Sequence, residues 1–121
     1  MAIKNVAVVS VPVSDQERAK AFYVDKLGFE LQADQSMPPL RWIRVGPKGG
    51  ATALTLVDWF DSMPAGSLRG LVVTTDDLQG DYERLKAKGV EFDGPPKKQP
   101  WATETVLHDP DGNRIVLQQA A

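Results

Sequence analysis

Apolar residues alternate with other residues along positions 3–13, and this alternation is the first structural signal in the chain. An extended chain divides them between two faces, with Val9, Val11 and Val13 on one and Val8, Ser10 and Pro12 on the other. The pattern predicts a β-strand. Because Pro12 has no N–H to donate to a neighbouring strand, we expect it at a sheet edge or at the strand end.

A helical period follows the first strand. Ser14-Asp15-Gln16-Glu17 has the spacing of a capping box, in which the Ser14 side chain accepts the N–H of Glu17 and the Glu17 carboxylate accepts the N–H of Ser14. We expect a helix from there to about Leu27, with Gly28 as its stop. Its apolar stripe consists of Ala19, Phe22, Tyr23 and Leu27.

Shorter patterns complete the first half of the chain. Phe29 and Leu31 predict the start of a short strand, and residues 32–39 predict a loop that contains two prolines. Two further strands are expected at 41–45 and 52–57, with a glycine-rich turn between them. Residues 58–67 form the longest irregular stretch and are the natural crossover to the second half.

The same order of elements then begins again. A strand pattern at 70–75 leads into Asp76-Asp77-Leu78-Gln79, which repeats the spacing of the first cap, and a helical stripe ends at Gly89. Strand patterns follow at 90–92, 101–108 and 114–118. The sequence therefore predicts a single domain over 1–121, with modules at about 3–57 and 68–118 and a crossover at about 58–67.

The last two strands are joined by a turn with a clear composition. In Asp109-Pro110-Asp111-Gly112-Asn113, proline fixes φ, glycine accepts a positive φ, and the Asp and Asn side chains can bond to the local backbone. A turn at this place pairs His108 with Arg114, Val106 with Val116, and Glu104 with Gln118.

This hairpin, the Pro100-Trp101 pair before it and the repeated module resemble the vicinal oxygen chelate superfamily, which holds glyoxalase I, extradiol dioxygenases and bleomycin-resistance proteins. The resemblance implies an α+β fold of two tandem β-α-β-β-β modules (a glyoxalase-like fold) whose curled sheets form a cleft. It also implies a homodimer, because short members pair so that each cleft borrows strands from both chains.

The resemblance also indicates where a metal would bind. Metal-dependent members hold a divalent ion with His, Glu or Gln from the first and last strands of each module, and the corresponding residues here are Val8, Thr55, Gly70 and Val116. Valine and glycine side chains have no lone pair, and a neutral threonine hydroxyl is a weak ligand. We therefore expect no metal and no other cofactor, and we expect the one histidine, His108, at the rim beside Arg114.

The composition of the chain excludes several classes of binding partner and of chemistry. The net charge is −2, the 14 basic residues are scattered, and there is no cysteine. A basic surface for nucleic acid or an anionic membrane is therefore not expected, and thiol chemistry and disulfides are excluded. No apolar run has the length of a membrane span and residues 1–13 lack the layout of a signal peptide, so a cytoplasmic location is the default expectation.

The predicted cleft is apolar at its floor, with a few polar contacts and aromatic walls. The floor residues are Val8, Val72, Val106 and Val116, the polar residues are Ser10, Thr55, Thr74, Glu104 and Gln118, and the candidate walls are Trp42, Trp59 and Trp101. This mixture suits a small, partly apolar or aromatic organic molecule. Each tryptophan has core or dimer packing as an alternative role, and Glu104 and Gln118 form either a hydrogen-bonded pair or a solvated one.

Three functions remain open from the sequence. The first is metal-independent binding, or sequestration, of such a molecule, similar to bleomycin-resistance proteins. The second is a lyase or dioxygenase related to glyoxalases, which acts through a metal site not recognisable here or through acid–base chemistry at Glu104. The third is a structural or regulatory domain without a ligand.

Overall fold

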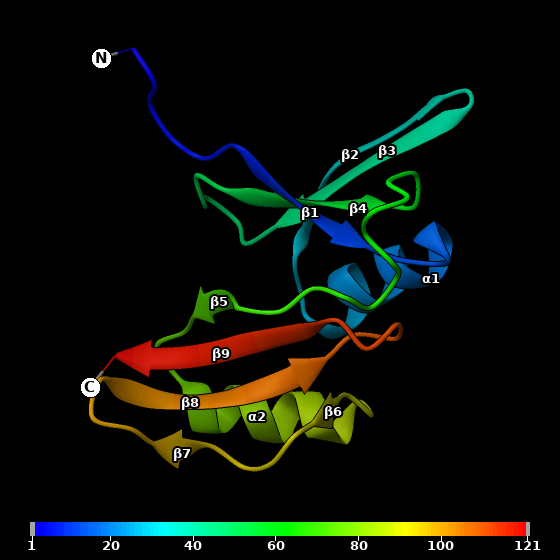
Figure 1. Cartoon of the computed structure of the whole chain (residues 1–121). Coiled ribbons are helices and arrows are strands. Elements are labelled where there is room, and N and C mark those ends of the chain that lie inside the picture. The colour runs from blue at the N-terminus through cyan, green and yellow to red at the C-terminus, as the bar shows by residue number, and fades with distance from the viewer. Residues whose placement is uncertain (1, 121) are drawn as a thin grey trace. The chain divides into compact units, whose positions relative to one another are not determined.

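The chain forms two compact units, Met1–Ala65 and Gly66–Ala121, and the computed structural model describes residues 2–120. Each unit has a mixed sheet and a helical segment between the first two strands of that sheet (Figure 1). Neither sheet closes into a barrel. The fold is therefore α+β with two repeated modules, as the sequence predicted.

The first unit contains a four-stranded sheet in the order β1-β4-β3-β2. Its strands are β1 (Val8–Pro12), β2 (Glu30–Met37), β3 (Leu40–Gly46) and β4 (Ala53–Val57). β1 runs parallel to β4, and the other pairs are antiparallel. α1 (Gln16–Ala21) continues as a π-helical turn, η1 (Phe22–Lys26), and both together span the predicted helix. The core of this unit is built from Val11, Ala19, Phe22, Tyr23, Ile43, Val45, Leu54 and Leu56.

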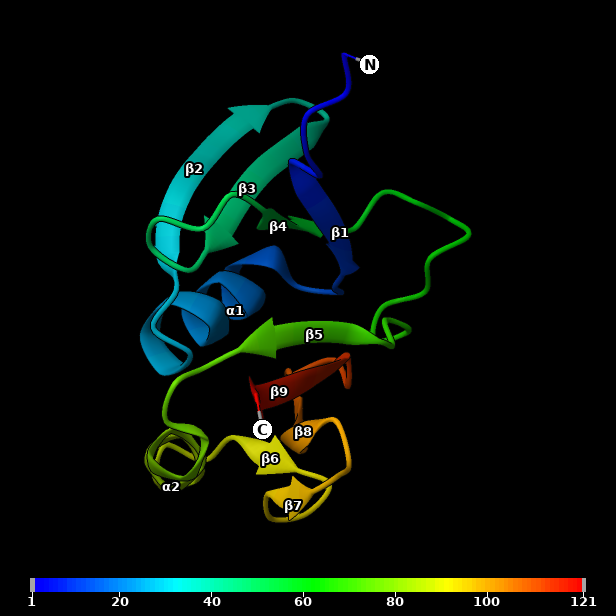
Figure 2. The same ribbon diagram turned by 90° about the vertical axis from the view of Figure 1, so that its left-hand side faces the viewer.

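Two sequence predictions in this unit are wrong. Residues 32–39 are not a loop, because β2 extends to Met37 and pairs with β3 along its length (Figure 2). β2 is an edge strand and most of it is exposed, so its side chains lack the apolar alternation from which strands are predicted. The first strand is also shorter than 3–13, because its partner β4 begins at Ala53, opposite Val8.

Both predicted helix caps are displaced by one residue. Asp15, not Ser14, accepts the N–H of Arg18 at 3.1 Å. Asp77, not Asp76, accepts the N–H of Gly80 at 3.1 Å. The first strand's hydrogen bonding continues to Val13, whose N–H reaches the carbonyl of Val57, so the helix begins later than the capping-box spacing indicated.

The second unit contains a sheet in the order β5-β9-β8-β6, with β7 also paired to β8. Its strands are β5 (Leu71–Thr74), β6 (Glu91–Phe92), β7 (Lys97–Lys98), β8 (Ala102–His108) and β9 (Arg114–Ala120). α2 (Leu78–Ala87) lies against one face of this sheet (Figure 1). The apolar residues of that face and of the helix are Leu71, Val73, Leu78, Leu85, Leu107, Ile115 and Leu117.

The hairpin between β8 and β9 has the predicted register, with His108 opposite Arg114 and Glu104 opposite Gln118. Its turn is closed by buried polar side chains. Asp109 Oδ1 accepts the N–H groups of Asp111 and Asn113, both at 2.9 Å. The turn is therefore rigid, and it fixes which β8 and β9 side chains share a face.

Among residues 2–120, no helix has the length and apolar character that crossing a membrane requires.

Candidate functional site

One face of the second sheet is not covered by α2, and it carries the predicted valines. Val72 lies opposite Val116, and Val116 lies opposite Val106, so three neighbouring strands contribute one row of valines. Val72 is 47% exposed. Two residues further along the strands, the same face carries a polar row of Thr74, Gln118 and Glu104. We call this surface, residues 72, 74, 104, 106, 116 and 118, the valine face.

Trp101 stands beside the valine face, and its indole is held by a hydrogen bond. Its Nε1 donates to Glu104 Oε1 at 2.7 Å, and Gln118 Nε2 donates to the same oxygen at 3.4 Å. Glu104 and Gln118 therefore form the hydrogen-bonded pair, which was one of the two alternatives for them. Trp101 is 62% exposed, so one large part of the ring remains available to a ligand.

His108 lies at the end of β8 beside the turn, as predicted. Its Nε2 forms a hydrogen bond with Asp93, and Arg114 Nη2 lies 4.0 Å from the same carboxylate oxygen. Asp93 thus lies close to both the imidazole of His108 and the guanidinium of Arg114. Sequence reasoning missed Asp93 because it lies just after the short strand β6, fifteen positions from His108, with no motif to connect the two.

In the first unit, the sheet face opposite α1 brings together the other predicted polar residues. Ser10 lies opposite Thr55 across β1 and β4, with their hydroxyl oxygens 3.4 Å apart. Thr55 also lies opposite Arg44 on β3, and Arg44 Nε donates to Gln32 at 2.8 Å. Arg44 was not among the predicted site residues. The strand register is the signal that places it there, because Arg44 and Trp42 share a face of β3.

The predicted aromatic residues of the first unit form a stack. The rings of Trp42 and Trp59 have centroids 6.5 Å apart and are inclined by 29°. Phe60 lies beside this stack, with its ring centroid 5.9 Å from that of Trp59 and its ring plane inclined by 45°, and it is 46% exposed. Trp42 and Trp59 are thus neighbours, although 17 positions separate them in the sequence. Val8, at the start of β1, lies two residues before Ser10, so both side chains are on the same face of the sheet.

The positions implied for metal ligands do not suit a metal ion. Val8 and Val116 have hydrocarbon side chains, Gly70 has none, and the Thr55 hydroxyl is already close to Ser10. In the described part of the chain, no three His, Cys, Asp or Glu side chains gather closely enough to hold a metal. The side chains at these four positions therefore do not provide a set of metal ligands, and we derive no reaction step through a metal from them.

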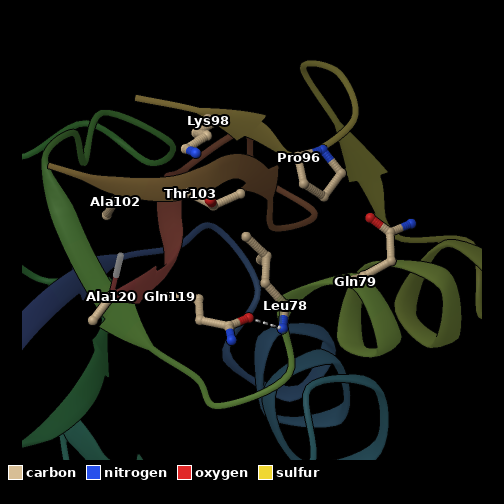
Figure 3. Close-up of a pocket in the computed structure, with 8 residues that line it drawn as sticks. All are labelled: Leu78, Gln79, Pro96, Lys98, Ala102, Thr103, Gln119 and Ala120. Carbon is tan, nitrogen blue, oxygen red and sulfur yellow. Dashed lines mark hydrogen bonds between the residues drawn. The ribbon is translucent and has the colours of Figure 1, made fainter. Parts of the chain in front are cut away.

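Two depressions occur elsewhere in the second unit. One, of about 410 Å³, opens beside the first turn of α2, where Gln119 Oε1 accepts the N–H of Leu78 at 2.9 Å (Figure 3). The other, of about 380 Å³, lies beside the edge-to-face pair of Tyr82 and Phe92 and includes His108. Neither includes any of the residues predicted to bind a ligand. The first depression lies on the other side of the sheet from the predicted residues. Gln119, which lines it, points to the helix side of the sheet, whereas Gln118 points to the valine face.

A network of charged side chains in the first unit lies on the β2–β3 hairpin and α1. Two hydrogen bonds from the Arg41 guanidinium and one from the Lys20 ammonium hold the pKa of Asp34 well below its usual range. Arg41 also pairs with Glu17 at 2.7 Å, and these carboxylates raise its pKa further. These groups connect β2 and β3 to α1, so we assign them to stability and not to the candidate site.

Comparison with known proteins agrees with this geometry. Residues 5–117 match the glyoxalase/bleomycin resistance protein/dioxygenase superfamily. The chain is similar to the crystal structure of TnmS3, an antibiotic binding protein from Streptomyces sp. CB03234, with 55% identity, a TM-score of 0.96, and coverage of 100% of this chain and 99% of that one. A superfamily member from Sphaerobacter thermophilus DSM 20745 is 35% identical, with a TM-score of 0.92 and coverage of 98% and 99%. The Bacillus subtilis (strain 168) protein YetH is 38% identical, and the match covers 97% of this chain and 99% of YetH.

Proposed function

This chain belongs to the glyoxalase/bleomycin resistance protein/dioxygenase superfamily, and from that membership we propose that it binds a small, partly apolar or aromatic organic molecule without a metal ion. Sequestration of such a molecule requires a shaped surface and no chemical step. The similarity to an antibiotic-binding protein over the whole chain supports a ligand of the antibiotic class.

The single observation that carries the proposal is the valine face with Trp101 beside it. A row of three valines offers apolar area, the polar row offers a few hydrogen-bonding groups, and the indole offers a flat ring. This combination is typical of sites for small organic ligands, where burial gives affinity and a few polar groups give orientation. The hydrogen bond to Glu104 holds the indole in place, so little freedom is lost when a ligand stacks on it.

The aromatic cluster of Trp42, Trp59 and Phe60 in the first unit supports the same class of ligand. Phe60 is exposed at the edge of this cluster, and an exposed aromatic ring can contact another planar group. Ser10 adds a half-buried hydroxyl group on that sheet face, and this hydroxyl contacts the buried Thr55. We propose both surfaces as ligand-binding, each on the argument of its own unit.

We further propose a homodimer. β2 is an edge strand of eight residues, it is largely exposed, and it carries the exposed apolar side chains Leu31 and Met37. An exposed apolar edge of this length favours association, and symmetric dimers are the commonest outcome. Light scattering combined with size-exclusion chromatography measures the mass, and a monomer at micromolar concentration would contradict this part of the proposal.

The test of ligand binding is a tryptophan-fluorescence titration with a panel of planar aromatic and glycopeptide compounds. Trp101→Ala removes the stacking ring, and we expect affinity to fall about 2- to 13-fold from the lost stack alone. Trp101→Phe is the matched variant, because it keeps a ring but loses the Nε1 donor to Glu104. We expect it to retain most of the affinity.

Two results would argue against the proposal. If a correctly folded Trp101→Ala protein binds as well as the wild type, Trp101 is a packing residue. If no compound of the panel binds, the result favours the alternative hypothesis that this chain is a structural or regulatory domain without a ligand. Turnover of a panel compound that depends on added metal would instead support the enzymatic alternative.

A further inference from the structure

The polar row of the valine face has an imbalance of hydrogen-bonding groups. Glu104 accepts two hydrogen bonds, and both reach Oε1. Among residues 2–120, no side chain forms an ion pair with Glu104 and no donor occupies its second oxygen. Lys97 is its register neighbour on β7, yet the two do not form an ion pair. Oε2 is therefore an available acceptor beside an apolar surface.

The orientation of Gln118 follows from the same contact. A carboxylate oxygen only accepts hydrogen bonds, so the amide nitrogen of Gln118, and not its oxygen, must face Glu104. The amide oxygen then points elsewhere, and within the described chain no donor reaches it. Gln119 provides the contrast, because its oxygen is already occupied by the N–H of Leu78. The polar row thus offers Glu104 Oε2 and Gln118 Oε1 as two acceptors.

Donors that are held in place are scarcer on the same surface. The indole N–H of Trp101 and one N–H of Gln118 are used by Glu104, which leaves the Thr74 hydroxyl and the second N–H of Gln118, beside the exposed ammonium of Lys97 on the neighbouring strand β7. A ligand that covers this face removes water from the two acceptors, and an acceptor without a donor then costs free energy. A ligand group that also accepts, such as a carboxylate, would in addition face the charge of Glu104.

We propose that Glu104 and Gln118 select ligands whose aromatic body carries a hydrogen-bond donor, such as a phenolic hydroxyl or an amino group, and discriminate against ligands with a carboxylate at that position. This inference rests on the proposed function, since it concerns selectivity at the valine face. The charged and titratable groups around Glu104 are Lys97 on β7 and, further along β8 and β9, His108 and Arg114.

The test compares three naphthalene probes by isothermal titration calorimetry. 2-Naphthol carries a donor, 2-methoxynaphthalene has the same ring without the donor, and 2-naphthoate carries a carboxylate. For the wild type we expect 2-naphthol to bind at least about tenfold more tightly than 2-methoxynaphthalene, because its hydrogen bond is made to a charged acceptor. We expect 2-naphthoate to bind most weakly.

Glu104→Gln is the informative variant. It keeps the size of the side chain and an oxygen that can accept from Trp101, but it removes the charge and introduces donors. We expect the preference for 2-naphthol over 2-naphthoate to fall at least about fivefold, from the loss of the charge-assisted contact. Glu83→Gln, on the exposed side of α2, makes the same change of charge away from the valine face and should leave the preference unchanged.

The outcomes separate the two claims. Equal affinity for 2-naphthol and 2-methoxynaphthalene would overturn the selectivity, while leaving the proposed function standing. An unchanged preference in a folded Glu104→Gln protein would overturn the role of Glu104. Binding of none of the three probes would contradict the proposed function itself, because the valine face would then not accept an aromatic ring.

Discussion

Asn113 closes the turn between β8 and β9, and its replacement by alanine should destabilise the second unit strongly. The residue is fully buried, at 0% exposure. Its Oδ1 accepts the N–H of Leu68 at 3.0 Å, and its Nδ2 donates to Asp109 Oδ2 at 2.7 Å. Asn113 therefore connects the turn to the chain segment that leads into β5.

The expected cost follows from these two hydrogen bonds. The contact with the Leu68 N–H is a neutral hydrogen bond, worth about 0.5–1.5 kcal/mol, and the contact with the Asp109 carboxylate is charge-assisted, worth about 1.5–3 kcal/mol. Asn113→Ala should therefore lower the free energy of unfolding by about 2–4.5 kcal/mol. In a chain of this length, 1 kcal/mol corresponds to roughly 3–5 °C, so the melting temperature should fall by about 6–22 °C.

Urea unfolding followed by fluorescence and far-ultraviolet circular dichroism measures this effect. An unchanged m-value would show that the substitution leaves the compactness of the folded and unfolded states unaltered. Asn5→Ala is the matched control, because Asn5 is exposed and makes one long contact of 3.4 Å with Ala51, and its change should stay within about 0.5 kcal/mol. Asn113→Asp keeps an acceptor for Leu68 but places a second carboxylate against Asp109 in a buried site, so it should destabilise at least as much as alanine at pH 7. A stability of Asn113→Ala equal to that of the Asn5→Ala control would refute the reasoning.

The remaining predictions concern the first helix, acid stability and metal content. Asp15→Ala should cost about 0.5–2 kcal/mol in thermal or urea unfolding, and Ser14→Ala should cost less; the reverse order would place the cap at Ser14 after all. The hydrogen bonds from Arg41 and Lys20 hold the pKa of Asp34 in the folded chain below its ordinary value of 3.8, so its contribution to stability is complete above about pH 4 and is lost as the pH falls further. Asp34→Asn should therefore narrow the difference in stability between pH 6 and pH 3, and an identical difference would contradict the role of Arg41. After dialysis, elemental analysis should find no stoichiometric zinc, nickel, manganese or iron, and about one metal ion per chain would contradict the argument from donor chemistry.

Features that depend on neighbouring residues in the chain were predictable from the sequence. The β8–β9 register follows from the turn composition, and once the turn is placed, the pairing of Val106 with Val116 and of Glu104 with Gln118 needs no further information. The apolar faces of β4 and α2, and the glycine stops of both helical segments, also follow from local periodicity. Gly28 and Gly89 take φ values of 78° and 87°, as a stop of this kind requires.

Features that depend on a partner strand or a distant side chain were not predictable. β2 is a strand because β3 supplies its hydrogen bonds, and backbone pairing leaves no trace in a mostly polar side-chain pattern. The first helix cap moved because the hydrogen bonding of β1 continues to Val13, and that depends on where β4 ends. In the second unit the N–H of Thr75 donates to the carbonyl of Gln118, so the pairing of β5 with β9 likewise continues beyond Thr74.

The candidate site shows the same division. Alternation with a period of two residues determined that Val116 and Gln118 share a face, because the side chains of a strand point to opposite sides in turn. The tertiary structure alone decided that Trp101 donates to Glu104, that Arg44 lies opposite Thr55, and that Asp93 pairs with His108. Those contacts depend on how loops and strands approach one another in space, and the sequence records only which groups are able to make them.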